Sequence, residues 1–204
     1  MLNKVVVSLV VLLCCVPAVM AEEAPVTVQL TMQTSMGTVE LALYPEKAPV
    51  TVANFLRLVD GEHLDGATFY RTVSPENDNG KPPIAVIQGG IGDAESPFAP
   101  IAHESTEQTG LLHLDGSLSM ARAEVGTAST EFFICIGAQP ALDFGATRNP
   151  DGQGFAVFGR VTAGMDVVHA IHQAPADAPT DFAYFENQLF NEPIVIESIR
   201  RSAP

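Results

Sequence analysis

The stretch Phe69-Tyr70-Arg71-Thr72-Val73, which a polar loop separates from Ile84-Ala85-Val86-Ile87-Gln88-Gly89-Gly90, decides how this chain folds. Aromatic and β-branched residues surround Arg71, and this pattern predicts a strand that holds the guanidinium on a sheet surface. Taken alone, such an Arg is more often an ordinary surface residue. The glycines after Gln88 allow close backbone approach and favour a ligand nearby. The two strands are therefore predicted to bring one guanidinium and one carboxamide together.

Composition limits the classes of protein to which the chain can belong. Its 204 residues are 47% hydrophobic and 17% charged, which fits one globular domain with an ordinary core. The formal net charge is -14. An acidic surface repels phosphate groups, so we expect neither nucleic acid nor anionic lipid as a partner.

Residues 1–21 have the pattern of a secretory signal peptide. Lys4 is the only charged residue there, and it precedes an apolar run and the segment Val19-Met20-Ala21. Because that run is short and interrupted by Pro17, a retained membrane anchor is the weaker interpretation. The sequence predicts a domain over 22–204 that is exported to the periplasm, with secretion as the alternative. We expect a monomer without stable membrane insertion.

Removal of residues 1–21 would leave Cys135 as the one cysteine of the chain, since Cys14 and Cys15 belong to the signal. An intramolecular disulfide is then impossible, even in an oxidising compartment. The large Leu13 before Cys14 argues against lipid attachment. Cys135 is expected to be a small buried residue.

Hydrophobic periodicity predicts many short strands and two helices. Alternation over 26–32 and 38–43 indicates a hairpin, and helical spacing runs from Pro49 to the stop at Gly61. Further strands are predicted at 68–73, 84–90, 118–121, 131–136, 155–161 and 194–200, with a second helix over 163–173. Two helices cannot cover a parallel sheet. The pattern favours a mainly β fold, a closed antiparallel barrel capped at its ends.

Two other patterns do not support a ligand site. Gly89-Gly90-Ile91-Gly92 has the glycines of a nucleotide loop, but the segment Asp93-Ala94-Glu95-Ser96-Pro97 is a poor start for a phosphate-binding helix. His169 and His172 share a helix face without an obvious third ligand, so we interpret them as a surface pair and predict no metal site.

Several separated motifs occur in the order of the cyclophilins. They are Phe69-Tyr70-Arg71, Gln88-Gly89-Gly90, Leu118-Ser119-Met120-Ala121, Phe132-Phe133-Ile134, and Phe158-Gly159-Arg160-Val161 before Gly164-Met165-Asp166-Val167-Val168. Motifs in the correct order are far more specific than any one of them. The chain resembles this family from about residue 27 to 200, and it is most similar to the bacterial exported members.

The resemblance implies an eight-stranded barrel with two helices, and peptidyl-prolyl isomerase activity on proline-containing polypeptides. It makes Arg71 the catalytic residue. The residues that it implies for substrate binding are Val86, Gln88, Ala121, Arg122, Glu131, Phe133, Leu142 and Phe155.

Some positions depart from the eukaryotic family pattern. Ala85 replaces an aromatic residue, Val86 a Met, Arg122 an Asn, Glu131 a Gln, Ala141 a Trp and Phe155 a His. Glu131 could be a solvated charge at a strand end, or it could pair with Arg122 or Arg71.

The implied chemistry needs few groups. Rotation about an X-Pro amide faces a barrier of roughly 18–20 kcal/mol because the C–N bond has double-bond character. As the amide twists, the prolyl nitrogen regains its lone pair, so a hydrogen-bond donor there stabilises the twisted state selectively. The resemblance makes Arg71 that donor. Since no nucleophile, metal or proton shuttle is required, we expect no cofactor.

A second hypothesis belongs to a different class. With the altered pocket residues, the chain could be a proline-peptide binding module or holdase without useful turnover. A structural or weak metal-binding role ranks far behind both. Turnover of a proline tetrapeptide separates the first two hypotheses.

Overall fold

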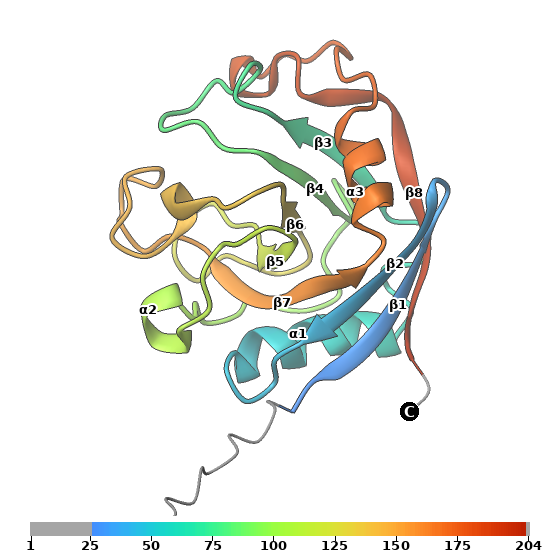
Figure 1. Cartoon of the computed structure of the whole chain (residues 1–204), viewed down its shortest axis with the longest axis vertical. Helices are drawn as coiled ribbons and strands as arrows, with labels where there is room; N and C mark the ends of the chain where they lie inside the picture. Colours follow the sequence, from blue (N-terminus) through green and yellow to red (C-terminus); the bar gives the residue numbers. More distant parts are fainter. Residues whose placement is uncertain (1–25, 203–204) are drawn as a thin grey trace, which may run out of the picture.

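A computed structural model describes residues 26–202, which form eight antiparallel strands closed into a barrel (Figure 1). Around the barrel the strands follow the order β1-β2-β7-β5-β6-β4-β3-β8, and β8 pairs with β1. Their bounds are β1 Val28–Thr34, β2 Gly37–Leu43, β3 Thr68–Val73, β4 Val86–Gly90, β5 Ser117–Met120, β6 Phe132–Cys135, β7 Ala156–Ala163 and β8 Leu189–Arg201. The predicted barrel and its first hairpin are confirmed.

The two predicted helices are present as α1, Pro49–Asp60, and α3, Met165–His172. Pro49 fits the first turn of α1 because the N–H that proline lacks has no helical partner there. The apolar face of α1 closes one end of the barrel, since the Phe55 ring lies 5.4 Å from Phe132 and 5.0 Å from Phe158.

One further helix, α2 over Thr106–Thr109, lies between the predicted strands 84–90 and 118–121, where we predicted no helix. Ser105 caps it: its hydroxyl accepts from the Gln108 N–H, and the Gln108 side chain accepts from the Ser105 N–H. A single helical turn is too short to show hydrophobic periodicity. Two 3₁₀ turns, Pro140–Leu142 and Ala183–Phe185, complete the elements of the described residues.

Strand alternation divides the buried residues into two clusters. Ile87 of β4 and Phe132 of β6 belong to the main core inside the barrel, with Phe55, Phe69 and Phe158. Val86 and Phe133, which precede Ile87 and follow Phe132 in the chain, point outward instead. They belong to a smaller cluster that comprises Val73, Ile84, Val86, Phe133, Cys135 and Leu142. All four residues of β6 are buried, so this strand is covered on both faces. The smaller cluster forms an apolar floor on the outside of the barrel.

A β-bulge interrupts β3 at Tyr70. Phe69 pairs with Gly89 and Arg71 pairs with Gln88, so Tyr70 is an extra residue without a partner on β4. On the other side, Phe69 pairs with Ile194 and Arg71 with Leu189. β8 begins at Leu189, earlier than the predicted start at residue 194. The strand can contain Pro193 because the β3–β8 hydrogen-bond ladder is interrupted there, so the N–H that proline lacks is not needed.

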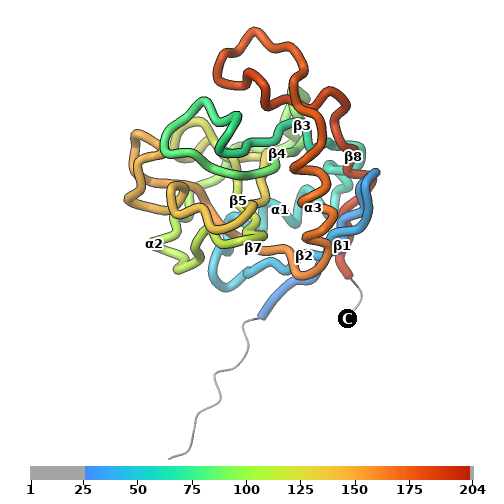
Figure 2. Tube along the Cα trace, turned by 45° about the horizontal axis from the view of Figure 1, so that its top comes forward, coloured from blue at the N-terminus to red at the C-terminus, as the bar shows by residue number. Residues whose placement is uncertain are grey.

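Three irregular segments lie around the outer floor: 74–85, 143–155 and 174–188. The last of them projects from the barrel between α3 and β8 (Figure 2). Within residues 26–202 no helix has the length and apolarity needed to cross a membrane. The predicted signal peptide, residues 1–21, lies outside the described residues.

Candidate active site

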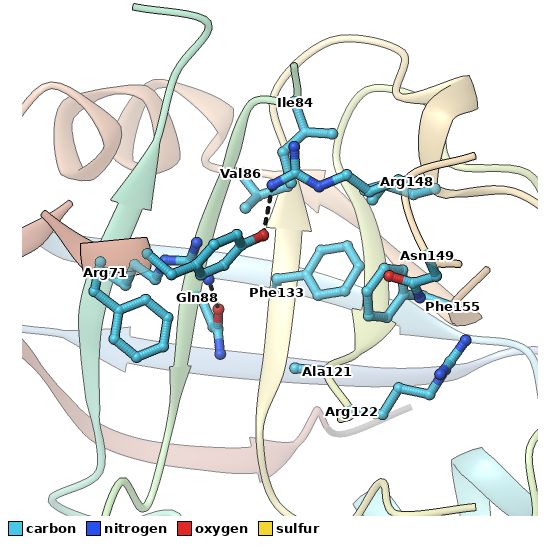
Figure 3. Close-up of a pocket in the computed structure, with 13 residues that line it drawn as sticks. Arg71, Ile84, Val86, Gln88, Ala121, Arg122, Phe133, Arg148, Asn149 and Phe155 are labelled. Carbon is cyan, nitrogen blue, oxygen red and sulfur yellow. Dashed lines mark hydrogen bonds between the residues drawn. The ribbon is translucent and has the colours of Figure 1, made fainter. Parts of the chain in front are cut away.

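Arg71 lies at one side of the outer floor (Figure 3) and is only 7% exposed. Its Nε and Nη2 groups donate to Gln188 Oε1 at 2.9 and 2.6 Å. Its Nη1 donates to Gln88 Oε1 at 2.9 Å, a bond that Figure 3 shows. A guanidinium has five N–H groups, so one on Nη1 and one on Nη2 have no partner in residues 26–202. The sequence predicts a guanidinium on a sheet surface, and the structure shows one that two carboxamides hold in a buried position.

The Arg71 guanidinium is also covered by aromatic rings. Its central carbon lies 4.7 Å from the Phe185 ring centre and 5.2 Å from that of Tyr184. Burial lowers the pKa of Arg71, but an arginine starts so high that it stays cationic. The guanidinium is therefore a permanent positive charge in a largely buried position.

A cavity of about 260 Å³ opens beside Arg71 (Figure 3). Phe133 forms its floor: it is 4% exposed, meets Phe155 edge to face at 5.3 Å, and stacks on the buried His113 at 5.8 Å. The lining residues are Arg71, Ile84, Val86, Gln88, Ala121, Arg122, Phe133, Leu142, Arg148, Asn149, Phe155, Tyr184 and Phe185. A cavity with an apolar floor and polar groups on both sides (Figure 3) suits a small apolar ring attached to a peptide backbone.

Arg148 ties the three irregular segments together. Its guanidinium donates to both carboxylate oxygens of Asp78 at 2.7 and 2.9 Å, to the Pro82 carbonyl at 2.8 Å and to the Tyr184 hydroxyl at 2.8 Å. Burial opposes ionisation of Asp78, but hydrogen bonds from Arg148, Gly80 and Ile84 hold its pKa below the ordinary value. We call these contacts of Arg148 with Asp78, Pro82 and Tyr184 the Arg148 clasp. In it, the Asp78 carboxylate neutralises the charge of Arg148, the second arginine at the cavity.

The structure brings most of the predicted residues into one cavity. Arg71, Val86, Gln88, Ala121, Arg122, Phe133, Leu142 and Phe155 line it together. Glu131 lines a neighbouring hollow of about 270 Å³, which shares Gln88, Ala121 and Arg122 with the main cavity.

Neither of the two alternatives for Glu131 describes its position: one of its carboxylate oxygens is buried, so it is not a fully solvated charge, and it pairs with neither arginine. Arg122 pairs with Asp151 at 2.7 Å, and Arg71 bonds to the two glutamines. The glycines after Gln88 allow close packing of protein atoms. A Cβ on Gly89 would meet the Thr68 carbonyl oxygen at 2.6 Å, and one on Gly90 would overlap the Glu131 carboxylate. Gln88 itself lines the cavity, so the expectation of a ligand beside it stays a prediction.

Sequence reasoning missed the loop side of the site. Arg148, Asn149, Tyr184 and Phe185 line the cavity, and the fully buried Gln188 holds Arg71. The cluster Phe182-Ala183-Tyr184-Phe185 is the signal that could have indicated them, because three aromatic residues in a short irregular segment are unusual.

Comparisons with known proteins agree with this geometry. The family model described as cyclophilin type peptidyl-prolyl cis-trans isomerase matches residues 28–201. The chain is 35% identical to peptidyl-prolyl cis-trans isomerase cyp18 of Streptomyces antibioticus, over 83% of this chain and 95% of that one. It is 32% identical to peptidyl-prolyl cis-trans isomerase A of Dickeya dadantii, over 87% and 86%.

A solved structure shares the fold. It is a cyclophilin type peptidyl-prolyl cis-trans isomerase of Cryptosporidium parvum, with a TM-score of 0.68 at 20% identity over 88% of this chain and 99% of that one. A second crystal structure of that protein was obtained in the presence of the dipeptide Ala-Pro, with a TM-score of 0.66 at 19% identity over 86% of this chain and 99% of that one. The chain belongs to the cyclophilin-type peptidyl-prolyl cis-trans isomerases, the enzymes that catalyse rotation of X-Pro peptide bonds.

Proposed function

We propose that Arg71 is the catalytic residue of this isomerase. The observation that carries the proposal is the pair of N–H groups on Nη1 and Nη2 that have no partner in the described residues and lie beside an apolar cavity. When the X-Pro amide twists, its nitrogen becomes pyramidal and can accept one of them. A hydrogen bond to a charged donor contributes about 1.5–3 kcal/mol, which corresponds to a rate increase of about ten- to a hundredfold if it forms only in the twisted state.

The rest of the cavity holds the proline while the acyl side rotates. Phe133, Leu142 and Val86 form the apolar surface for the pyrrolidine ring, with Ala121 and Phe155 at its edge. Gln88 orients Arg71, and Arg122 borders both the cavity and the neighbouring hollow. No step requires a cofactor or a metal. The substrates are proline-containing polypeptides, and the chain acts as a monomer.

The cellular role follows from the N-terminal sequence. Residues 1–21 act as a signal peptide, and the mature protein begins at or near Glu22 as one isomerase domain in the periplasm. It assists the folding of exported polypeptides there, as one of the bacterial exported members of the family; a secreted protein is the alternative. Mass spectrometry of the exported protein tests this proposal. A mass that begins near Glu22 is expected, and one that retains residues 1–21 contradicts it.

Turnover distinguishes the isomerase from a binding module or holdase. Purified chain 22–204 should accelerate cis–trans exchange of a proline tetrapeptide above the uncatalysed rate, which is one event in tens of seconds or longer. Peptide binding without faster exchange, together with suppression of aggregation of an unfolded client, would favour the holdase.

A further inference from the structure

The β3 bulge places two consecutive side chains on one carboxamide. In a regular strand Tyr70 and Arg71 would point to opposite faces. Because Tyr70 is the extra residue, both reach Gln88: Arg71 Nη1 donates to Gln88 Oε1 at 2.9 Å, and Gln88 Nε2 donates to the Tyr70 hydroxyl oxygen at 2.7 Å. Gln88 therefore has only one correct amide orientation, with its oxygen toward the cation and its nitrogen toward the tyrosine.

The Tyr70 hydroxyl faces a carboxylate with an unsatisfied oxygen. Glu131 Oε1 accepts from the Gly92 N–H at 3.1 Å and from the Thr130 hydroxyl at 3.4 Å. Its Oε2 is buried and has no hydrogen-bond partner among residues 26–202. Burial, followed by the negative charge of Glu131, raises the pKa of Tyr70, which keeps the phenol protonated and able to donate toward this carboxylate. A buried acceptor thus lies next to a donor whose hydrogen is not otherwise used.

The surroundings of Glu131 leave its charge without a cation. Tyr70 is the titratable side chain that faces it, and Thr130 and the backbone at Ile91 and Gly92 offer neutral donors. Arg122 lines the same hollow but is paired with Asp151. Burial raises the pKa of the Glu131 carboxyl above its ordinary value. Placing a carboxylate here therefore costs stability, and such a cost is typical of a residue that serves function.

We propose that Glu131 and Tyr70 are positioning residues for Arg71. The Glu131 carboxylate holds the Tyr70 hydroxyl, the hydroxyl oxygen holds the Gln88 amide nitrogen, and the Gln88 oxygen holds the guanidinium, so that a directed hydrogen-bond relay links Arg71 to Glu131. This inference rests on the proposed role of Arg71 as the catalytic residue.

The relay makes turnover depend on the protonation of Glu131. The ionised carboxylate attracts the Tyr70 hydrogen and fixes the order of donors and acceptors through Gln88. The protonated acid can itself donate to the Tyr70 oxygen and compete with Gln88 for that acceptor, so that the Gln88 amide, and with it the guanidinium, is held less firmly. Turnover is therefore expected to fall as pH falls through the folded-state pKa of Glu131.

Glu131→Gln and Tyr70→Phe test the relay, with Glu124→Gln as a matched control at an exposed carboxylate. At neutral pH each relay variant should lower kcat about tenfold and leave KM nearly unchanged. Each one removes the proposed hydrogen bond from the Tyr70 hydroxyl to the Glu131 carboxylate, and the loss of one charged hydrogen bond corresponds to a factor of about ten. The acid limb of the pH profile should disappear in Glu131→Gln. The double variant should lose no more activity than either single one, because both act through one path. Glu124→Gln should match the wild type.

Two further measurements separate positioning from a structural role and from failure of the proposed function. Glu131→Gln should be at least as stable as the wild type near neutral pH, because it removes a buried charge, while it is less active. By NMR, the Arg71 Nε–H resonance should titrate with Glu131 in the wild type and not in Glu131→Gln, whether or not the protein turns over. An Arg71 resonance that does not titrate, or additive losses of kcat in the double variant, would overturn the relay. An inactive wild type with a titrating resonance would contradict the proposed function alone.

Discussion

The two walls of the cavity are held by different kinds of contact. On the sheet wall, Arg71, Gln88 and Phe133 stand on β3, β4 and β6, where the hydrogen-bond ladder fixes every backbone position. On the loop wall, Arg148 and Tyr184 stand on irregular segments joined mainly by side-chain contacts of the Arg148 clasp. The difference teaches that changes to the apolar residues of the sheet wall affect folding and chemistry together. The loop wall depends on a few polar contacts.

The largest effect on stability is expected at Phe133, which forms the floor of the sheet wall. Phe133→Ala would leave a cavity beneath β6 and should lower the free energy of unfolding by about 3–5 kcal/mol, with loss of turnover. Chemical denaturation measures it. Phe182→Ala is the matched control, because that ring is 71% exposed and its loss should change stability by less than about 0.5 kcal/mol. Equal effects at the two positions would remove the distinction between the walls.

The Arg148 clasp should be the weak point of the loop wall. Asp78→Asn leaves Arg148 buried without its carboxylate and should cost on the order of 3 kcal/mol. Asp151→Asn is the control, since the Asp151 side chain is 34% exposed and its pair with Arg122 should contribute at most about 1 kcal/mol. Hydrogen exchange should rise in segments 74–85 and 143–155 of the first variant while the barrel strands stay protected.

The stabilisation that the Arg148 clasp provides has a defined pH dependence. The folded-state pKa of Asp78 lies below its ordinary value of 3.8, so the stabilisation is present above that value and is lost as pH falls through the folded-state pKa. Wild-type loops should therefore begin to open only below about pH 4, and Asp78→Asn should lack this acid transition. Loop protection that is unchanged in acid would contradict the assignment.

Gln188 is the loop residue that accepts hydrogen bonds from Arg71 in the described part of the chain, and its replacement should have a smaller effect than the loss of the Asp78–Arg148 pair. Gln188→Leu keeps the volume but removes the acceptor that receives two Arg71 donors. The loss of a charged hydrogen bond of about 1.5–3 kcal/mol predicts a fall in kcat/KM of about ten- to a hundredfold. Steady-state kinetics on a proline peptide measures it. Unchanged kinetics would mean that Gln88 alone positions Arg71.

The sheet wall was predictable from sequence in two steps. Strand alternation predicted a barrel and placed Arg71 on a strand. Alternation alone does not separate a cavity residue from a core residue, and it was the resemblance to the cyclophilins that implied a substrate-binding role for Phe133. Phe132 and Phe133 are neighbours, yet one enters the core and the other forms the cavity floor. The β3 bulge was not visible, since nothing in Phe69-Tyr70-Arg71 marks an extra residue, and so the shared contact with Gln88 was missed.

The loop wall was not predictable because tertiary contacts place it. Asp78 and Arg148 are 70 residues apart, and Arg71 and Gln188 are 117 apart. No periodicity relates such positions. The start of β8 was also hidden, because Pro193 lies opposite the bulge and had the appearance of a strand boundary.

The central claim is that Arg71 acts on the twisted amide and is not merely a docking residue. The most direct measurement is the exchange of a proline peptide bound at saturation, followed by NMR in the wild type and in Arg71→Ala and Arg71→Lys. Saturation separates exchange on the enzyme from affinity, which titration gives independently.

Arg71→Ala should slow the bound exchange by about 10²–10³-fold while the peptide Kd changes by less than about tenfold. Arg71→Lys should recover little, because lysine lacks the planar fork that Gln88 and Gln188 hold. Thermal melts of both variants confirm that they are folded. Undiminished exchange in folded Arg71→Ala, or a loss of affinity as large as the loss of exchange, would contradict the claim.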